Sequence, residues 1–251
     1  MTPKEFVSLS MSKAADDLYQ NSDEAKDFVF DQKVVDVFPD MIGRSVPGYW
    51  DVTDRTALIA SRYWQPKSTV YDLGASLGAA SWALWKSFPM NEVPIVAIDA
   101  SEPMVRRFRC HLSQTTATSI DVKHNDLRTV PLRNSSVVVL NYTLQFVPPS
   151  SRLEVLEKIY LALLPGGVLL MSEKIALNDS ESNEAIRRLH HDWKHQQGYS
   201  WQEIQKKSQA ISQVMPVDTL EDHRLRLQRV GFSSVLVWNQ QYNFISLMAT
   251  K

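Results

Sequence analysis

The sequence predicts an α/β fold of the Rossmann-like type, in which helices cover both faces of a mostly parallel sheet. Through the middle of the chain, short β-branched and apolar segments alternate with amphipathic helical segments, as in βαβ units. The apolar segments are nearly continuous, which is typical of strands buried on both faces. Four of them end at or just before a polar residue, so ligand-binding side chains are expected to gather at one edge of the sheet.

Five strands and three helices are predicted in order up to residue 171. The strands are expected at 68–73, 94–98, 120–124, 136–140 and 168–171, and the helices at 79–88, 102–114 and 150–164. Leu153, Leu156, Ile159, Tyr160 and Leu163 share one face of the third helix. Pro165-Gly166-Gly167 is expected to end it.

The alternation of strands and helices stops after the fifth strand. Residues 176–217 are polar and mostly helical in pattern, and an insertion at this place would lie over the carboxyl ends of the strands, where ligands bind. We interpret it as a lid on the substrate side. A helix over 220–230, closed by Gly231, and a hairpin of 234–238 and 242–248 turning through 239–241 complete the chain. Seven strands ending in a hairpin are the arrangement of the class I methyltransferase fold.

The N-terminal part is expected to be helical. Residues 1–27 are interpreted as a separate arm or helix, with weak helical periodicity from Phe6 to Tyr19, and 28–251 as a single domain. Two helical stretches in 28–63 are expected to be interrupted at Pro39 and at Pro47-Gly48, because proline disfavours continuing a helix.

Composition excludes several classes of protein. The 251 residues carry a net charge of −1, so no strong field would attract nucleic acid or an anionic membrane. The single cysteine, Cys110, excludes a disulfide-stabilised secreted fold, and we expect it to be buried. A cytoplasmic location is expected, because the chain shows neither a signal-peptide core nor the ~20 apolar residues that cross a bilayer.

The segment from Val70 to Gly78 (VYDLGASLG) carries the strongest local signal, since it joins the first strand to the first helix. Glycine at 74 and 78 lets the backbone approach a ligand, and N–H groups at a helix start favour an anion. The expected anion is the carboxylate of the methionine part of S-adenosylmethionine (SAM). Asp72 is expected to face its amino group.

Three further strand ends extend this site. Asp99 ends the second strand, where a carboxylate binds the hydroxyls of a ribose. Asp126 follows the third strand, where a side chain can reach the adenine amino group, and Asn141 follows the fourth, beside the reacting centre. The set predicts SAM as the cofactor. No metal site is expected, because His190 and His191 have no second cluster of ligands at a suitable spacing; we interpret them as packing residues, with His191 the alternative candidate for a base.

One alternative from the residues is a hydrolase. Gly74 to Gly78 also spells Gly-x-Ser-x-Gly, in which Ser76 would be a nucleophile and His223 a candidate base. In α/β-hydrolases this pattern forms the turn that carries the nucleophile, and it follows several strands of the sheet. Here it follows the first predicted strand, and a hydrolase would leave Asp99 without a role.

Several segments resemble the carboxy-S-adenosylmethionine synthase family, which converts SAM and prephenate to the carboxylated cofactor used in tRNA wobble-uridine modification. The similar segments are 38–49 (FPDMIGRSVPGY), 71–80 (YDLGASLGAA), 138–146 (VVLNYTLQF), 172–174 (SEK), 190–192 (HHD) and 198–200 (GYS). The resemblance covers about residue 28 to the end. It implies a small-molecule acceptor, no direct nucleic-acid binding and a homodimer.

The resemblance also implies roles for individual residues. Tyr49 is similar to a family tyrosine that reaches over the cofactor and is a candidate catalytic residue with His191. The cofactor loop would comprise Gly74, Ala75, Ser76 and Gly78, with Ala75 where the family often has cysteine. Ala100 beside Asp99, Leu127 beside Asp126, and Asn141 match the remaining cofactor contacts. Arg44 is a candidate for the second substrate.

One position departs from the family. The family binds the transferred carboxylate with an arginine, and this chain has Ser208 there. A hydroxyl cannot replace a guanidinium fork, and the adjacent lysine, Lys207, is expected to point elsewhere because a helix turns about 100° per residue. We therefore expect a small-molecule methyltransferase that diverged from carboxy-SAM synthase. The alternatives are carboxy-SAM synthesis from prephenate and a non-catalytic binding protein on the same fold.

Overall fold

The strands form a mostly parallel sheet that confirms the predicted fold class. The computed structural model describes residues 1–9, 15–20, 28–88 and 93–251, and in this part of the chain the sheet has seven strands in the order β3-β2-β1-β4-β5-β7-β6. Only β7 runs antiparallel to its neighbours. The strands are β1 (Thr69–Leu73), β2 (Ile95–Asp99), β3 (Ile120–His124), β4 (Ser135–Asn141), β5 (Leu163–Lys174), β6 (Ser234–Gln241) and β7 (Phe244–Thr250).

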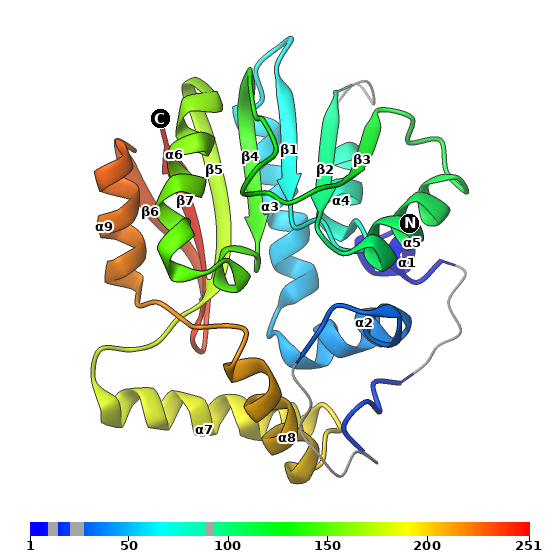
Figure 1. Cartoon of the computed structure of the whole chain (residues 1–251), viewed down its shortest axis with the longest axis vertical. Helices are drawn as coiled ribbons and strands as arrows, with labels where there is room; N and C mark the ends of the chain where they lie inside the picture. The colour runs from blue at the N-terminus through cyan, green and yellow to red at the C-terminus, as the bar shows by residue number, and fades with distance from the viewer. Residues whose placement is uncertain (10–14, 21–27, 89–92) are drawn as a thin grey trace.

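Helices cover both faces of this sheet (Figure 1). The α-helices are α1 (Pro3–Val7), α2 (Gln32–Ser45), α3 (Tyr49–Tyr63), α4 (Ala79–Ser87), α5 (Glu102–Leu112), α6 (Arg152–Ala162), α7 (Ser180–Gln196), α8 (Trp201–Ser212) and α9 (Leu220–Val230). Side chains of β4 alternate between two apolar clusters: Val137 and Val139 pack with α3, α4 and α5, and Val138 and Leu140 pack with α6 and α9. The strand is therefore buried on both faces, as its continuous apolar sequence predicts.

The prediction that Pro39 interrupts a helix is wrong. Helix α2 continues through it from Gln32 to Ser45. Proline inside a helix removes one hydrogen bond. Here Pro39 is buried with Val35, Phe38 and Met41, and this apolar packing offsets the loss.

The prediction that Cys110 is buried is also wrong, since its side chain is exposed. Helix α5 buries Met104, Val105, Phe108 and His111, which share one face. Residue 110 lies about 200° around the helix from residue 108, on the outer face.

Two predicted boundaries differ from the structure. Helix α6 ends at Ala162, and Pro165-Gly166-Gly167 lies inside β5, which starts at Leu163 because that residue pairs with Ser135 of β4 across a register shift. Strands β6 and β7 pair as far as Gln241 and Phe244, so the hairpin turns at Tyr242-Asn243, not at 239–241. Tyr242 adopts a left-handed φ of 51° at this tight turn.

The insertion after β5 leaves the sheet and returns to the same place. Ala176 donates its N–H to the Asp218 carbonyl at 2.9 Å and pairs with Thr219. The fully buried Arg152 of α6 holds the returning end, because it forms an ion pair with Asp218 at 2.6 Å and donates to the Pro216 carbonyl at 2.7 Å. Between these ends, α7 and α8 lie with α2 beyond the carboxyl ends of β1 and β4 (Figure 1).

The N-terminal helix α1 is shorter than the Phe6 to Tyr19 prediction. It ends at Val7, and residues 10–14 and 21–27 lie outside the described residues. Phe6 is fully buried and stacks on Trp82 of α4, with ring centroids 4.6 Å apart. No helix in the described part of the chain is long and apolar enough to cross a membrane.

Candidate cofactor and substrate site

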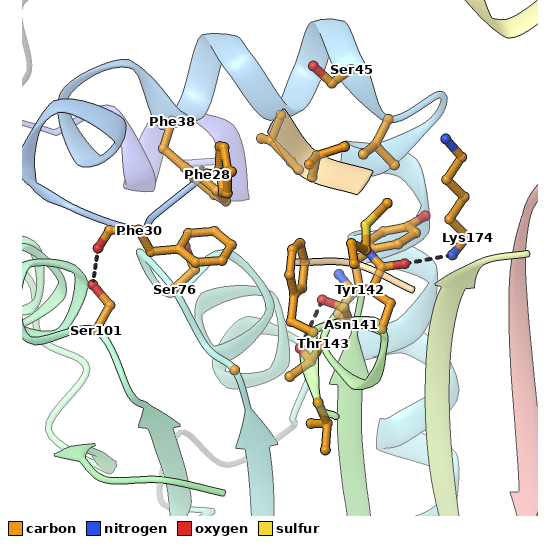
Figure 2. Close-up of a pocket in the computed structure, with 18 of the residues that line it drawn as sticks. Phe28, Phe30, Phe38, Ser45, Ser76, Ser101, Asn141, Tyr142, Thr143 and Lys174 are labelled. Carbon is orange, nitrogen blue, oxygen red and sulfur yellow. Dashed lines mark hydrogen bonds between the residues drawn. The ribbon is translucent and has the colours of Figure 1, made fainter. Parts of the chain in front are cut away.

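A cavity of about 520 Å³ lies between the carboxyl ends of the strands and the helices α2, α7 and α8. Figure 2 shows Ser76, Asn141 and Lys174 at the strand side, facing Phe38 and Ser45 of α2. Phe28 and Phe30, which precede α2, add an aromatic wall that the sequence analysis did not identify.

The loop between β1 and α4 forms part of the cavity wall through Gly74 and Ser76. Gly74 has a φ of +79°, and a Cβ there would lie 2.3 Å from the Thr143 side chain. The N–H of Ser76 donates to Asp99 Oδ2 at 2.7 Å, which ties the loop to the end of β2. Ala75 and Gly78 do not line the cavity; Gly78 instead begins α4 against the Phe108 ring.

Replacing Gly78 with alanine is expected to lower the free energy of unfolding by about 3 kcal/mol, from a strained positive φ together with a steric clash. The residue has a φ of +89°, and the new Cβ would lie 2.1 Å from a Phe108 ring carbon. Gly166→Ala is the matched control, because Gly166 has a φ of +75° and its nearest described atom would lie at 3.8 Å. It should cost only about 1 kcal/mol in urea unfolding. Equal losses in the two variants would contradict the clash.

Asp99 lines the cavity at the end of β2, next to Ala100, which also lines it. Its Oδ1 accepts the Ser101 N–H at 2.8 Å while Oδ2 accepts that of Ser76. Burial raises the pKa of Asp99, and these two hydrogen bonds oppose the rise. Each carboxylate oxygen has a second lone pair for a hydroxyl, so the group can accept two hydrogen bonds from a ribose diol.

Asp126, Leu127 and Asn141 all line the same cavity. Asp126 accepts three hydrogen bonds from the Arg128 guanidinium, which lowers the pKa of its carboxyl. The Oδ1 atom of Asn141 is buried without a hydrogen-bond partner among the described residues. A buried acceptor of this kind needs a donor, so the site fits a ligand with a polar group beside β4.

Asp72 does not line the cavity. Its side chain is buried behind the loop, where Oδ2 accepts a hydrogen bond from the Ser81 hydroxyl at 2.6 Å. Burial raises the pKa of Asp72 to about 6. Its contact holds β1 to the first turn of α4, so it supports the loop from within the protein.

Tyr49, His190 and His191 line the cavity from α3 and α7. Burial raises the pKa of Tyr49 above its ordinary value, so the phenol stays protonated. Burial, together with Lys194 and other cations, lowers the pKa of His191 to about 4, and that imidazole is neutral at pH 7. One ring nitrogen of His190 lies 3.0 Å from the Ser45 carbonyl, which agrees with its interpretation as a packing residue.

The two candidates for the second substrate have different surroundings. Arg44 does not line the cavity, because its guanidinium is held by Asp40 at 2.5 Å and lies over the Tyr199 ring. Ser208 does line it. Lys207 lines it as well, so the expectation that this lysine points elsewhere is wrong: α8 packs with one edge against α2, and both positions reach the cavity wall.

Two lysines that the sequence analysis did not identify supply charge to the wall: Lys174 at the end of β5 and Lys194 on α7. Neither ammonium forms a hydrogen bond or an ion pair with any residue in the described ranges, and burial lowers the pKa of Lys174 to about 8 and that of Lys194 to about 7. Figure 2 shows the Lys174 side chain extending from β5 towards α2. Lys194 is spaced four residues from His190, and this helical spacing was the available signal.

Comparison with known proteins agrees with this geometry. Residues 70–167 match the family model described as a methyltransferase domain. The chain is 46% identical to the carboxy-S-adenosyl-L-methionine synthase of Vibrio campbellii, over 91% of this chain and 94% of the relative. It is also 46% identical to that of Photobacterium profundum, over 90% and 93% of the two chains.

Solved structures show the same fold. Human N-acetylserotonin methyltransferase in complex with SAM has a TM-score of 0.56 at 19% identity, with 80% of this chain and 52% of that chain covered. A possible exported protein from Bordetella parapertussis has a TM-score of 0.63 at 16% identity, with 100% and 79% covered.

The fold, the methyltransferase domain and the related enzymes define a SAM-dependent transferase of class I that acts on a small molecule. Within that class, the chain belongs to the carboxy-S-adenosyl-L-methionine synthase family. The hydrolase alternative has no geometric support, because His223 is buried on α9 and does not line the cavity with Ser76. Among the described residues, no group of three potential metal ligands occurs.

Proposed function

We propose that the second substrate is a small molecule carrying a carboxylate, and that the reaction is carboxy-SAM synthesis with prephenate. The observation that carries this proposal is a pair of lysines that line the cavity, the partly buried Lys174 and the buried Lys194, whose ammonium groups form no hydrogen bond or ion pair in the described part of the chain. Burying an unpaired ammonium is costly. A bound carboxylate would offset that cost and accept charge-assisted hydrogen bonds.

The two ends of the cavity differ in charge, and this difference supports the assignment of the cofactor to one end and of the second substrate to the other. Its acidic side chains, Asp99 and Asp126, lie at the ends of β2 and β3. Its unpaired cations come from β5 and α7. We therefore assign adenosine to the acidic end with Gly74, Ser76 and Asn141, and the carboxylate substrate to the basic end.

When bound, SAM would supply a sulfonium-activated methyl group. The residues of this chain would position the second substrate against it, and such positioning accounts for much of the rate in reactions of this kind. Lys174 and Lys194 would fix the carboxylate. Tyr49 would shape the pocket as a neutral phenol, and the neutral imidazole of His191 is able to accept a proton. The lid helices α7 and α8 would exclude water.

The direct test is mass spectrometry of the protein incubated with SAM, with and without prephenate. We expect a cofactor product in which one carboxylate has replaced one hydrogen, together with phenylpyruvate and water, only when prephenate is present; the water takes the ring hydroxyl of prephenate and the hydrogen displaced from the cofactor. Unmodified cofactor in the presence of prephenate would reject carboxy-SAM synthesis. The Asp99→Ala variant serves as the control for a reaction that needs this cofactor site.

Methyl transfer is the second candidate, and Ser208 is the observation that favours it. This residue lines the cavity as a neutral hydroxyl, at the position where the resemblance implies an arginine in the family. The substrate would then be a carboxylate-bearing acceptor that takes the methyl group. The homodimer, the cytoplasmic location and the division at residue 27 stay predictions.

A further inference from the structure

Asp16 lies in a buried polar cluster where the N-terminal arm meets α2 and α8. Its side chain forms an ion pair with Lys207 at 3.0 Å and accepts a hydrogen bond from the Tyr199 hydroxyl. Only 2% of Asp16 is exposed. Its main chain is also held, since its N–H donates to Asp40 at 2.7 Å and its carbonyl accepts from Arg44 at 3.1 Å.

This cluster uses the full donor capacity of Lys207. An ammonium has three N–H donors. Those of Lys207 meet Asp16 at 3.0 Å, the Ser45 hydroxyl at 2.9 Å and the Tyr199 hydroxyl at 3.2 Å. Lys207 lines the substrate cavity beside Ser208, yet it has neither a donor nor a net charge left for a ligand.

We propose that Asp16 is a specificity-determining residue, because it neutralises Lys207 and so confines anion binding to Lys174 and Lys194. The proposal rests on the proposed function, in which the second substrate is a carboxylate. The anion subsite of this chain thus lies at Lys174 of β5 and Lys194 of α7, and not at Lys207 and Ser208 of α8. One of the two carboxylates of prephenate would bind at this subsite. The α8 side of the cavity would offer that carboxylate only groups without net charge.

The test is calorimetric titration of prephenate into the full chain saturated with S-adenosylhomocysteine, which lacks the transferable methyl group and prevents turnover. In the Asp16→Asn variant, the freed charge of Lys207 should tighten prephenate binding about tenfold. A purely structural role for Asp16 predicts weaker binding instead. Unchanged or weaker binding would therefore overturn the proposal.

The double variant Asp16→Asn/Lys207→Met removes both charges and keeps the test decisive if the single variant does not fold. The neutral pair of Asp16 and Lys207 contributes no net attraction for an anion. The affinity of the double variant for prephenate should therefore stay within about twofold of the affinity of the unaltered chain. A loss of tenfold or more would show that Lys207 binds the anion and would reject the proposal. Asp17→Asn, at the exposed neighbouring residue, is the matched control, and an equal gain there would reject it as well.

The outcome separates this inference from the proposed function. Suppose that the unaltered chain does not bind prephenate and does not carboxylate SAM with it, whereas the Asp16→Asn variant binds prephenate. The role of Asp16 then stands, and prephenate is not the substrate. If binding depends on Lys174 and Lys194 and Asp16→Asn brings no gain, the function stands and the role of Asp16 is wrong.

Discussion

Replacing Asp99 with alanine is expected to weaken SAM binding by at least about 100-fold, since two charge-assisted hydrogen bonds to a ribose diol contribute roughly 1.5–3 kcal/mol each. The substitution also removes the acceptor for the Ser76 and Ser101 N–H groups, so the loop that lines the cavity loses its tie to β2. Calorimetric titration with SAM measures the change directly.

Asp121→Ala is the matched control for this prediction. Asp121 lies on the neighbouring strand β3, and its carboxylate is exposed and pairs only with Lys123 in the described structure. We expect SAM affinity there to stay within about twofold, as for surface substitutions away from a site. An Asp99→Ala variant with unchanged affinity would show that the cofactor binds elsewhere.

Replacing Lys174 or Lys194 with methionine is expected to lower kcat/KM for prephenate by about 30- to 150-fold per residue, because each loses a charge-assisted contact of ~2–3 kcal/mol. SAM affinity should change little. The free energy of unfolding should rise by about 1 kcal/mol, since an unpaired buried ammonium is replaced by an apolar chain of similar length. Steady-state kinetics and urea unfolding of the same variants measure both effects.

Opposite changes in activity and stability identify a ligand-binding cation, and a structural lysine would lower both. Lys123→Met, at an exposed lysine of β3, should change neither. If both cavity variants keep full activity with prephenate, the basic end is not the anion subsite.

The same lysines predict how binding depends on pH. Their protonated forms bind the anion, so affinity for prephenate should fall as the pH rises through 7 to 8, near the pKa of about 7 for Lys194 and about 8 for Lys174. The stability of the ligand-free protein follows the opposite sign. Between these values and the ordinary lysine pKa, the unfolded chain binds more protons, so the contribution of these groups to stability rises with pH.

The strands and the cofactor end were predictable from sequence because both depend on local pattern. Continuous apolar runs and their polar ends predict β1 to β4, and Asp99, Asp126 and Asn141 do line one cavity. Asp72 and Arg44 differ because other side chains hold them away from the cavity. Ser81 of α4 binds Asp72 of β1, a contact that residue spacing does not indicate. Asp40 pairs with Arg44 at the i, i+4 spacing of α2, and this spacing was the available signal.

The basic end was not predictable for a related reason. Lysine on a polar amphipathic helix is ordinarily solvated, and the spacing of Lys194 four residues from His190 is the one signal in α7 that this lysine faces inward. Its burial follows from the way α7 lies against α8 and beyond the strand ends. Asp16 is a stronger case, because its partner Lys207 lies far along the chain, on α8.

The meeting of the two ends of the insertion at Ala176 and Thr219 has an evolutionary consequence. A segment that departs and returns at one point can lengthen, shorten or change its sequence without shifting the strands that flank it, because loop closure costs little more as a loop grows. The residues on α7 and α8 to which we assign the second substrate can therefore diverge while the residues on β1 to β4 to which we assign the cofactor stay constant. Ser208, at the position where the resemblance implies an arginine in the family, would be an early step on that route.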